Sequence, residues 1–492
     1  MSNKLAYRAD IDGLRAIAVL SVVIFHINPQ WLPGGFLGVD IFFVISGYLI
    51  TKIISREMME KNFSFINFYK RRAKRILPVF VFVLSVTTVA SLVLFTKEDF
   101  VNYNKSLLSA FLFSANLYFS RQGDYFDISS NEKPLMHIWS LSVEEQFYFI
   151  FPIVLLLGFK FWKSKMSYLI LLLVIFSLLS WFLPSWGLEK YFLPHVRAYE
   201  LLIGSLFSFI NPIRKSTLNI ILLFSLSFLG MLCLFIPKGF IWGNGYIERL
   251  LLCTAIGFII LYGGGCKENL IAKMLSYNLL VKIGLISYSL YLWHWVILSL
   301  LRYVSMDVHL SVYLIVFSIV LMFLFSMLTY RYIENPVRKI KLPNKLFLRW
   351  VCVYFSICVL IFSCYYVMNI TSLSSGKNGL NWDTSSNCHG VIDMSKCTKG
   401  YIGASPKILV IGDSHAGQYN QFFHYLGIKE KWAADVISEN SCNFILYGNK
   451  KVPFRAQKCL TAIEYAEKNI EKYDTVIFIS NWHSRFKENG YF

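Results

Sequence analysis

Long apolar runs recur along the first three-quarters of the sequence and are separated by short polar loops. A helical run of about twenty apolar residues matches the thickness of a bilayer. We therefore predict about eleven membrane-spanning helices. The apolar run at 106–119 is too short to cross, and we interpret it as a re-entrant or surface helix. The predicted spans are 14–29, 36–54, 77–95, 137–159, 166–184, 196–211, 218–236, 249–265, 281–301, 310–330 and 347–367.

The pattern changes after residue 370. A stretch rich in Ser, Gly and Asn at 372–390 is typical of a linker. The segment KILVIGDSHAGQYNQFFHYL at 407–426 then predicts a buried strand, a tight turn and an amphipathic helix. A helix at 461–470 and a second buried strand at 475–480 complete an α/β pattern. The predicted organisation is a helical membrane domain at 1–345, a further span at 346–370, an exterior linker at 371–403 and an α/β domain at 404–492.

Composition and charge support a membrane protein. The chain is 56% hydrophobic and only 16% charged, whereas soluble proteins average about 25% charged residues. The net charge of +19 does not indicate nucleic-acid binding, because Lys and Arg concentrate in the loops on one side of the predicted spans. The positive-inside rule places those loops and the N-terminus in the cytoplasm. An odd number of spans then places the segment after residue 370 outside. The polar start MSNKLAYRAD predicts no cleavable signal.

Four cysteines in the exterior segment agree with this orientation: Cys388, Cys397, Cys442 and Cys459. Disulfides form in oxidising compartments such as a bacterial periplasm. Three pairings are possible, of which Cys388–Cys397 with Cys442–Cys459 is the most local. The sequence shows no metal-ligand motif of the CxxC or HExxH type, so we expect no metal.

Titratable residues in the first two spans are candidates for chemistry. Arg15 and His26 are eleven residues apart, which is three helical turns, so both side chains project from one face roughly 17 Å apart. Such groups in a bilayer are costly and indicate function by default, although a snorkelling arginine and a structural histidine are the alternative. Asp40 in the second span could orient His26 and raise its basicity.

Two further segments carry clustered charges. YKRRAKRILP at 69–78 is either a positive-inside anchor or a phosphate site, in which Arg72 and Arg75 at i, i+3 share a helix face and Arg71 assists. HIWSLSVEEQ places Glu144 and its neighbour Glu145 at the mouth of a span. We interpret the remaining intramembrane charged and titratable residues as structural; they are Arg197, Glu200, His294, Glu334 and Arg338.

The exterior segment contains a Gly-Asp-Ser turn after a predicted strand. Such a turn exposes Ser414 at a helix N-terminus, where backbone N–H groups can stabilise an oxyanion. Ser414 is therefore a candidate acyl-accepting nucleophile.

Taken together, these segments resemble the bacterial acyltransferase family 3 membrane proteins. The resemblance rests on YRADIDGLRAIAVLSVVIFH, LGVDIFFVISGYLIT, RRAKRILP, HIWSLSVEEQFYFIFP, RAYELLIG and ISYSLYLWHW, which occur in this order over about 5–340. Among these proteins, the chain looks most like members with an extra span and a fused SGNH-type domain that O-acetylate lipopolysaccharide O-antigen. The resemblance implies a polytopic α-helical membrane protein of the bacterial inner membrane, followed by a partial, three-layer α/β domain in the periplasm. It also implies acetyl-CoA as the cytoplasmic donor and a lipid-linked or surface polysaccharide as the acceptor.

The resemblance also implies roles for individual residues. The family's Arg and His pair falls on Arg15 and His26, its RxxR motif on Arg72 and Arg75, and its acid on Glu144. The SGNH nucleophile falls on Ser414, and Asn481 corresponds to an oxyanion-hole asparagine. The terminal Asp-x-x-His motif has no counterpart before the final KENGYF, so the exterior domain is expected to be incomplete.

The expected reaction has several open alternatives. His26 either takes the acetyl group or acts as a general base, with Asp40 or Glu144 orienting it and Arg15 anchoring the donor. The acetyl group then passes to Ser414 or directly to the glycan. Peptidoglycan is an alternative acceptor. A transporter whose intramembrane charges line a pathway, without covalent chemistry, is the alternative from another class, and an inactive remnant is a third.

Overall fold

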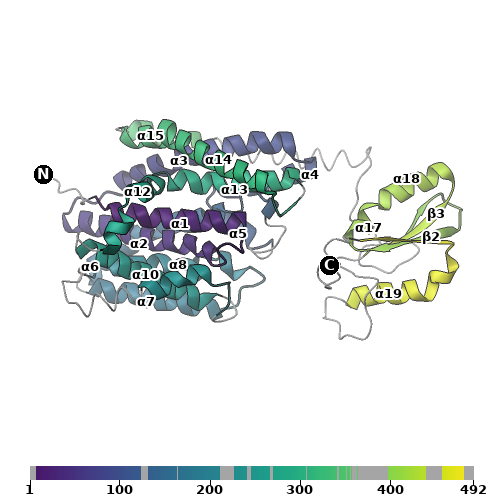
Figure 1. Cartoon of the computed structure of the whole chain (residues 1–492), viewed down its shortest axis with the longest axis horizontal. Coiled ribbons are helices and arrows are strands. Elements are labelled where there is room, and N and C mark those ends of the chain that lie inside the picture. The colour runs from purple at the N-terminus through teal and green to yellow at the C-terminus, as the bar shows by residue number, and fades with distance from the viewer. Residues whose placement is uncertain are drawn as a thin grey trace. The chain divides into compact units, whose positions relative to one another are not determined.

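The computed structural model divides the chain into two compact units, Met1–Met368 and Asn369–Phe492, which are described separately (Figure 1). The described residues are 7–122, 131–162, 165–210, 227–240, 245–265, 270–305, 307–340, 343–350, 352–354, 356, 359, 363, 397–438 and 457–480.

The first unit is a bundle of helices that lie side by side (Figure 1). Shorter 3₁₀ turns occupy Gly35–Leu37, Ser180–Phe182, Lys190–Phe192 and Cys233–Phe235, and a π-helical turn spans Tyr330–Glu334. The α-helices are α1 (Ala9–Ile27), α2 (Gly38–Met59), α3 (Phe65–Leu94), α4 (Lys97–Phe111), α5 (Ala115–Phe119), α6 (Ile138–Trp162), α7 (Met166–Leu179), α8 (Pro194–Ser208), α10 (Tyr246–Gly265), α11 (Leu270–Leu275), α12 (Asn278–Leu285), α13 (Ser287–Ser305), α14 (Val312–Thr329) and α15 (Asn335–Lys339).

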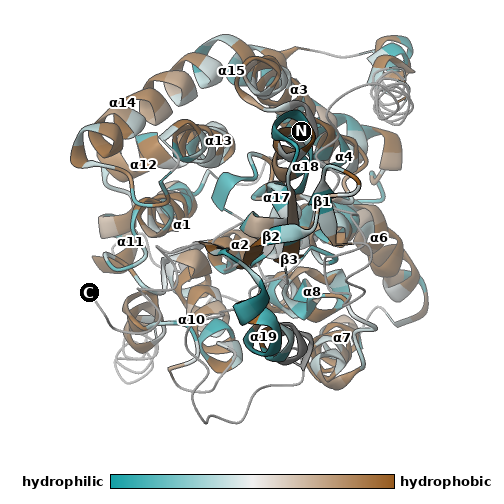
Figure 2. Cartoon of the chain, turned by 90° about the vertical axis from the view of Figure 1, so that its right-hand side faces the viewer, coloured by the Kyte–Doolittle hydropathy of each residue, from teal (hydrophilic) through white to brown (hydrophobic). Residues whose placement is uncertain are grey.

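The bundle has several helices that can cross a bilayer, so the chain is a multi-pass membrane protein. Among the described residues, five helical segments are long and apolar enough, and the pair α12 and α13, bent by 67°, is a sixth if it forms one span. The outward-facing parts of α14 and α7 are strongly hydrophobic (Figure 2). The five segments are Gly35–Met59, Phe65–Leu94, Ile138–Trp162, Tyr246–Gly263 and Val312–Lys339.

Several predicted spans take a different form. The apolar pattern at 166–184 continues through the 3₁₀ turn at Ser180–Phe182, so that α7 has only 14 residues, and α8 has 15. In α1 the charged residues lie in the first two turns, which leaves an apolar stretch of roughly 18 Å. The predicted spans 218–236 and 347–367 lie largely outside the described residues. The count of eleven therefore stays a prediction.

Close helix contacts enclose α1 and α8 in the bundle. A Cβ atom on Gly47 of α2 would lie 1.8 Å from the Leu201 carbonyl oxygen of α8, and one on Gly204 of α8 would lie 2.0 Å from that of Val44. The two backbones can approach this closely only because both contact positions lack a side chain, as is common between membrane helices. Thirteen residues of α1 are buried. Polar side chains on α1 and α8 thus face protein instead of lipid.

The second unit contains a four-stranded sheet in the order β1-β3-β2-β4. Strand β2 is parallel to both β3 and β4, whereas β1 is antiparallel to β3. Leu409 of β2 packs with Ala466 of α19 on one face, and Val410 packs with Phe423 of α18 on the other. Helices thus cover both faces of a mixed α/β unit. The elements are β1 (Thr398–Gly400), β2 (Pro406–Gly412), α17 (Ser414–Gln418), α18 (Asn420–Glu430), β3 (Ala433–Ser438), α19 (Gln457–Asn469) and β4 (Thr475–Ile479).

This unit differs from the sequence prediction in detail. The predicted helix after the Gly-Asp-Ser turn is two helices that break at Tyr419. Strands β1 and β3 were not predicted. Cys397 is disulfide-bonded, in agreement with an oxidising compartment. Its predicted partner Cys388 lies outside the described part of the chain, as does Cys442 of the predicted pair Cys442–Cys459, so both pairings stay predictions.

Candidate functional site

Three arginines and a glutamate from three helices line one cavity of about 120 Å³. Arg15 comes from α1, Arg72 and Arg75 from successive turns of α3, and Glu144 from α6. The structure thus brings together four residues that the sequence singled out in three separate segments. We call this cavity, defined by Arg15, Arg72, Arg75 and Glu144, the arginine cavity.

The contacts in the arginine cavity leave positive charge available. The Arg72 guanidinium lies 3.9 Å above the Tyr148 ring centroid, and its Nη2 is 3.8 Å from Glu144 Oε1. Glu144 Oε1 also accepts hydrogen bonds from the Ser46 hydroxyl at 2.5 Å and from the Tyr148 hydroxyl. Within the described residues, Arg72 Nε is buried without a hydrogen-bond partner and Arg75 has no ion pair. Guanidinium groups with unused donors are suited to hold a phosphate.

The other basic residues of this segment lie outside the cavity lining. Arg71 is exposed and forms an ion pair with Glu57, with Nη2 and Oε1 2.8 Å apart. Lys74 donates to the carbonyl oxygens of Arg338 and Ile340 near the end of α15. The prediction that Arg71 shares the phosphate site is therefore corrected: its side chain turns to an acid on α2 instead of to the cavity.

His26 lies in a cluster of buried aromatic and imidazole rings. Its Nδ1 is 3.1 Å from Nε2 of His294 on α13, and its ring packs edge-on against Trp295 with centroids 4.5 Å apart. Arg302 Nη2 donates to the His26 carbonyl oxygen at 2.5 Å. His137 is the third histidine, with its ring centroid 5.8 Å from that of His294.

The hydrogen bonds fix where the protons lie when the rings are neutral. His294 Nδ1 is 2.5 Å from the Tyr291 carbonyl oxygen, which can only accept. Nδ1 of His294 therefore carries its proton, its Nε2 accepts, and His26 Nδ1 must donate to it. The lone pair of His26 is thereby placed on Nε2.

Tyr291 and Ser140 connect the histidine cluster to the arginine cavity. Both residues line that cavity, and their hydroxyl oxygens are 2.6 Å apart. The Tyr291 hydroxyl also donates to the His137 carbonyl oxygen at 3.0 Å. His26 is not among the residues that line the arginine cavity; this pair of residues stands between them. Sequence reasoning missed Tyr291 and took His294 as structural, although ISYSLYLWHW contains both.

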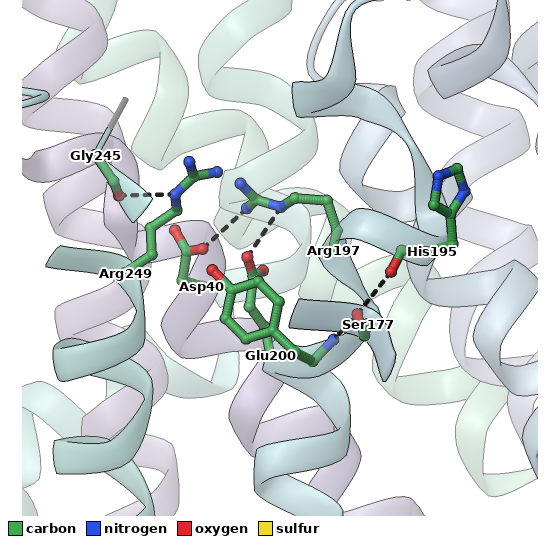
Figure 3. A network of polar contacts seen from close by, with 8 residues as sticks. Asp40, Ser177, His195, Arg197, Glu200, Gly245 and Arg249 are labelled. Atoms are coloured by element: carbon green, nitrogen blue, oxygen red, sulfur yellow. Dashed lines mark hydrogen bonds and ion pairs between the residues drawn. The ribbon is translucent and has the colours of Figure 1, made fainter. Parts of the chain in front are cut away.

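A second buried network joins α2, α8 and α10 (Figure 3). Arg197 Nη2 is 2.9 Å from Asp40 Oδ1, and Arg197 Nε is 3.0 Å from Glu200 Oε1, with all three side chains fully buried. Arg249 Nε donates to the Gly245 carbonyl oxygen at 2.9 Å, beside the same group (Figure 3).

This network corrects the prediction for Asp40. The carboxylate was expected to orient His26, but the structure pairs it with Arg197, because a buried carboxylate needs a counter-charge and α8 packs directly on α2. Glu144, the other residue expected to orient His26, lies beside Arg72 in the arginine cavity. The predicted pair Arg197–Glu200 is present, extended by Asp40.

In the α/β unit, Ser414 begins α17 directly after the central strand β2. The preceding Asp413 accepts a hydrogen bond from the His415 backbone N–H at 2.9 Å and one from the Ser480 hydroxyl at 2.8 Å. Ligands of parallel sheets bind at the carboxyl ends of the strands, where Ser414 lies. The Ser414 side chain and Asn481 fall outside the described part of the chain.

The fold and site define a class: a multi-pass membrane protein with an arginine-lined cavity next to a histidine cluster, followed by an α/β unit. An acyltransferase domain model matches residues 8–331, and a model of the SGNH domain that is fused to such domains matches 383–491. The chain thus belongs to the acyltransferase 3 family, which confirms the resemblance seen in its motifs.

Curated relatives carry the same kind of name. A "Putative O-acetyltransferase" of Staphylococcus aureus strain MSSA476 is 35% identical over 363 residues, covering 68% of this chain and 58% of the relative. The "O-acetyltransferase OatA" of Staphylococcus aureus strain NCTC 8325 is 36% identical over 354 residues, covering 68% and 57%. The match therefore spans less than two-thirds of the length of these relatives. No solved structure matches the chain.

Proposed function

We propose that this protein is a membrane O-acetyltransferase that moves acetyl from cytoplasmic acetyl-CoA, by way of His26, to a hydroxyl of a cell-envelope glycan. One observation carries the proposal. The arginine cavity and the histidine cluster share Tyr291, which lines the cavity and whose carbonyl oxygen accepts a hydrogen bond from His294, the partner of His26.

The arginine cavity fits the donor. Coenzyme A carries several phosphates, and three arginines line the cavity. Arg15 pairs with Asp12 at 3.3 Å, and Arg72 lies 3.8 Å from Glu144 and 3.7 Å from Glu145. Arg75, without an ion pair in the described part of the chain, is the residue most available for a phosphate. The positive-inside rule assigns this end of the bundle to the cytoplasm, where acetyl-CoA is made.

The chemistry falls to Nε2 of His26. In one route this nitrogen attacks the thioester carbonyl, the carbon–sulfur bond breaks, and coenzyme A leaves as a thiolate that takes up a proton. The acceptor hydroxyl then attacks the acetyl-imidazolium, the bond between Nε2 and the acetyl carbon breaks, and the proton lost by the hydroxyl balances the one taken up by the thiolate, so that His26 returns to its neutral form. In the other route Nε2 removes the hydroxyl proton as the oxygen attacks the thioester directly, and that proton passes to the leaving thiolate.

The acceptor we propose is peptidoglycan. This choice is supported by the likeness to O-acetyltransferases of Staphylococcus aureus, among them OatA. Lipopolysaccharide O-antigen, which the motifs first suggested, is the alternative. Ser414 at the edge of the α/β sheet is the proposed relay if the acetyl group passes through a second covalent intermediate.

The test compares envelope acetylation in cells that carry the wild type, His26→Ala or His309→Ala. His309 is an exposed histidine on the loop before α14 and is the matched control. Acetyl esters are measured separately on purified peptidoglycan and on other envelope glycans. The proposal expects ester on peptidoglycan with the wild type and His309→Ala, and at most a few per cent of it with His26→Ala. Equal ester content with His26→Ala and with the wild type would overturn the role of His26. Acetyl ester found only on another polymer would overturn the choice of peptidoglycan as the acceptor.

A further inference from the structure

We propose that a second cavity, near the far end of α3, is the binding site for an uncharged sugar ring, the acceptor of the acetyl group. This inference rests on the proposed function, because it names the substrate site of the same reaction. The cavity has a volume of about 180 Å³. We call it the outer cavity and define it by Phe95, Asp99, Tyr118, Glu132 and Tyr303.

The histidine cluster lies between the two cavities. On α13, Tyr291 lines the arginine cavity and Tyr303 lines the outer cavity, about 18 Å further along the helix. His294 sits between them, one turn from Tyr291. The segment that leads into α6 repeats this order, because Lys133 lines the outer cavity, Ser140 lines the arginine cavity and His137 lies between them.

One indole ring joins the outer cavity to His26. Trp295 Nε1 donates to the Lys133 carbonyl oxygen at 2.8 Å, and its ring packs on the His26 ring at 4.5 Å. A ligand in the outer cavity would thus lie against the segment that holds Trp295, whose ring packs on His26. Trp295 thus lies between the outer cavity and His26, which is not among the residues that line this cavity.

The lining of the outer cavity combines aromatic rings with amide and carboxylate groups. Sugar rings present an apolar C–H face, which packs on aromatic side chains, and a rim of hydroxyls, which pair with carboxylates and amides. Two of these groups are held in place: Tyr303 donates to Asp99 Oδ2 at 2.7 Å, and its ring packs on Phe95 at 4.3 Å. Asn102 and Gln122 add amide groups to the lining. An apolar wall with a few placed polar groups is typical of a small-molecule site.

Charge separates the two cavities. The outer cavity contains Asp99 and Glu132 against Lys133 alone, so it has no positive excess. The lining of the arginine cavity contains three arginines and Glu144; the neighbouring acids Asp12 and Glu145 pair with Arg15 and Arg72, and Arg75 has no ion pair within the described residues. A polyanion such as coenzyme A or a phosphate-bearing glycan is therefore favoured only in the arginine cavity. The ligand class for the outer cavity is a neutral pyranose, as in a chain of N-acetylated amino sugars.

The test measures binding of an N-acetylglucosamine tetramer to the purified full chain in detergent, without acetyl-CoA. Tyr118→Ala removes a partly exposed ring of the outer cavity, and Tyr118→Phe keeps the ring. Tyr313→Ala, which removes a ring that is 89% exposed on α14, is the aromatic control outside the cavity. We expect the Kd to rise at least about tenfold for Tyr118→Ala and to change less than about twofold for the other two variants. Acetyl-CoA binding, measured with labelled donor, should be the same in all four proteins.

The outcomes are distinguishable. Equal affinity of Tyr118→Ala and wild type for the tetramer, no binding by the wild type, or tighter binding of a poly(glycerol phosphate) probe than of the tetramer would each overturn the sugar site. Loss of acetyl-CoA binding in Tyr118→Ala would also overturn it, because the substitution would then act on the whole bundle. If the wild type binds the tetramer through this cavity and yet releases no coenzyme A from acetyl-CoA, the proposed function fails and the sugar site stands.

Discussion

Replacing Asp40 separates a structural from a catalytic role for this carboxylate. Asp40 and Arg197 are fully buried and 2.9 Å apart, and Arg197 also pairs with Glu200 at 3.0 Å. Removing one partner of a buried ion pair costs about 3–5 kcal/mol, because the other charge stays buried. Asp40→Ala should lower the free energy of unfolding by this amount.

A more conservative change gives a graded result. Asp40→Asn keeps the volume and one acceptor for Arg197, and Glu200 still balances the guanidinium, so we expect a loss of about 1.5–3 kcal/mol, the contribution of a hydrogen bond to a charged group. The control is Glu60→Gln in the ion pair Arg56–Glu60, where the side chains are 24% and 41% exposed. An exposed pair contributes at most about 1 kcal/mol.

The assay is denaturant unfolding in detergent micelles, run beside coenzyme A release from acetyl-CoA by the same preparations. A structural Asp40 predicts that Asp40→Asn loses stability and retains acetyl transfer below its unfolding transition. An Asp40→Asn variant as stable as the wild type whose release of coenzyme A falls about 100-fold would refute the reasoning. Asp40 would then act in the chemistry, as the sequence first suggested.

Three further predictions follow from the same contacts. Arg75→Ala should raise the KM for acetyl-CoA at least about tenfold, since a charge-assisted hydrogen bond contributes about 1.5–3 kcal/mol. Replacing the exposed Arg71 by Ala should leave steady-state kinetics unchanged. Equal effects of the two substitutions on KM would contradict the arginine cavity as the donor site. His294→Leu should lower kcat about 100-fold at unchanged KM. His294→Gln retains an acceptor for the His26 Nδ1 proton, so its kcat should be at least about tenfold higher than that of His294→Leu. Equal kcat values for the two variants would exclude a role of His294 in fixing the tautomer of His26. Gly47→Ala should reduce the monodisperse yield in size-exclusion chromatography, because its Cβ would lie 1.8 Å from the Leu201 carbonyl oxygen; a wild-type elution profile would show that α2 and α8 do not pack this closely.

The parts of the site that lie within one helix could be predicted from the sequence. Arg15 and His26 both lie on α1, and Arg72 and Arg75 both line one cavity, because spacing along a helix determines which residues share a face. The strand at 475–479 was equally readable from its run of apolar residues.

The contacts between distant helices could not be predicted. His26 meets His294 across 268 residues and Asp40 meets Arg197 across 157, and helical periodicity contains no information about which helix lies opposite. Asp40, the first carboxylate after His26 in the sequence, therefore looked like its partner. The close packing of α8 on α2 at Gly47 and Gly204 instead places Arg197 beside Asp40.

Strand β3 was missed and the length of the helix at 166–184 was overestimated for local reasons. Strand β3 begins with two alanines, which have low strand preference. It pairs with β1 and β2 within the sheet, and its two faces are buried by α18 and α19. The apolar run that contains α7 extends past the helix into a 3₁₀ turn, so hydropathy alone overestimated the length of the span.

The measurement that tests the central claim most directly is rapid mixing of the purified full chain with acetyl-CoA and an N-acetylglucosamine tetramer as the acceptor, followed by the release of coenzyme A over time. The account predicts release by the wild type and by His309→Ala, and a rate at least about 100-fold lower for His26→Ala at an unchanged affinity for acetyl-CoA. Release by His26→Ala at the wild-type rate would contradict the claim that the imidazole of His26 carries out the transfer of acetyl from coenzyme A, by either route.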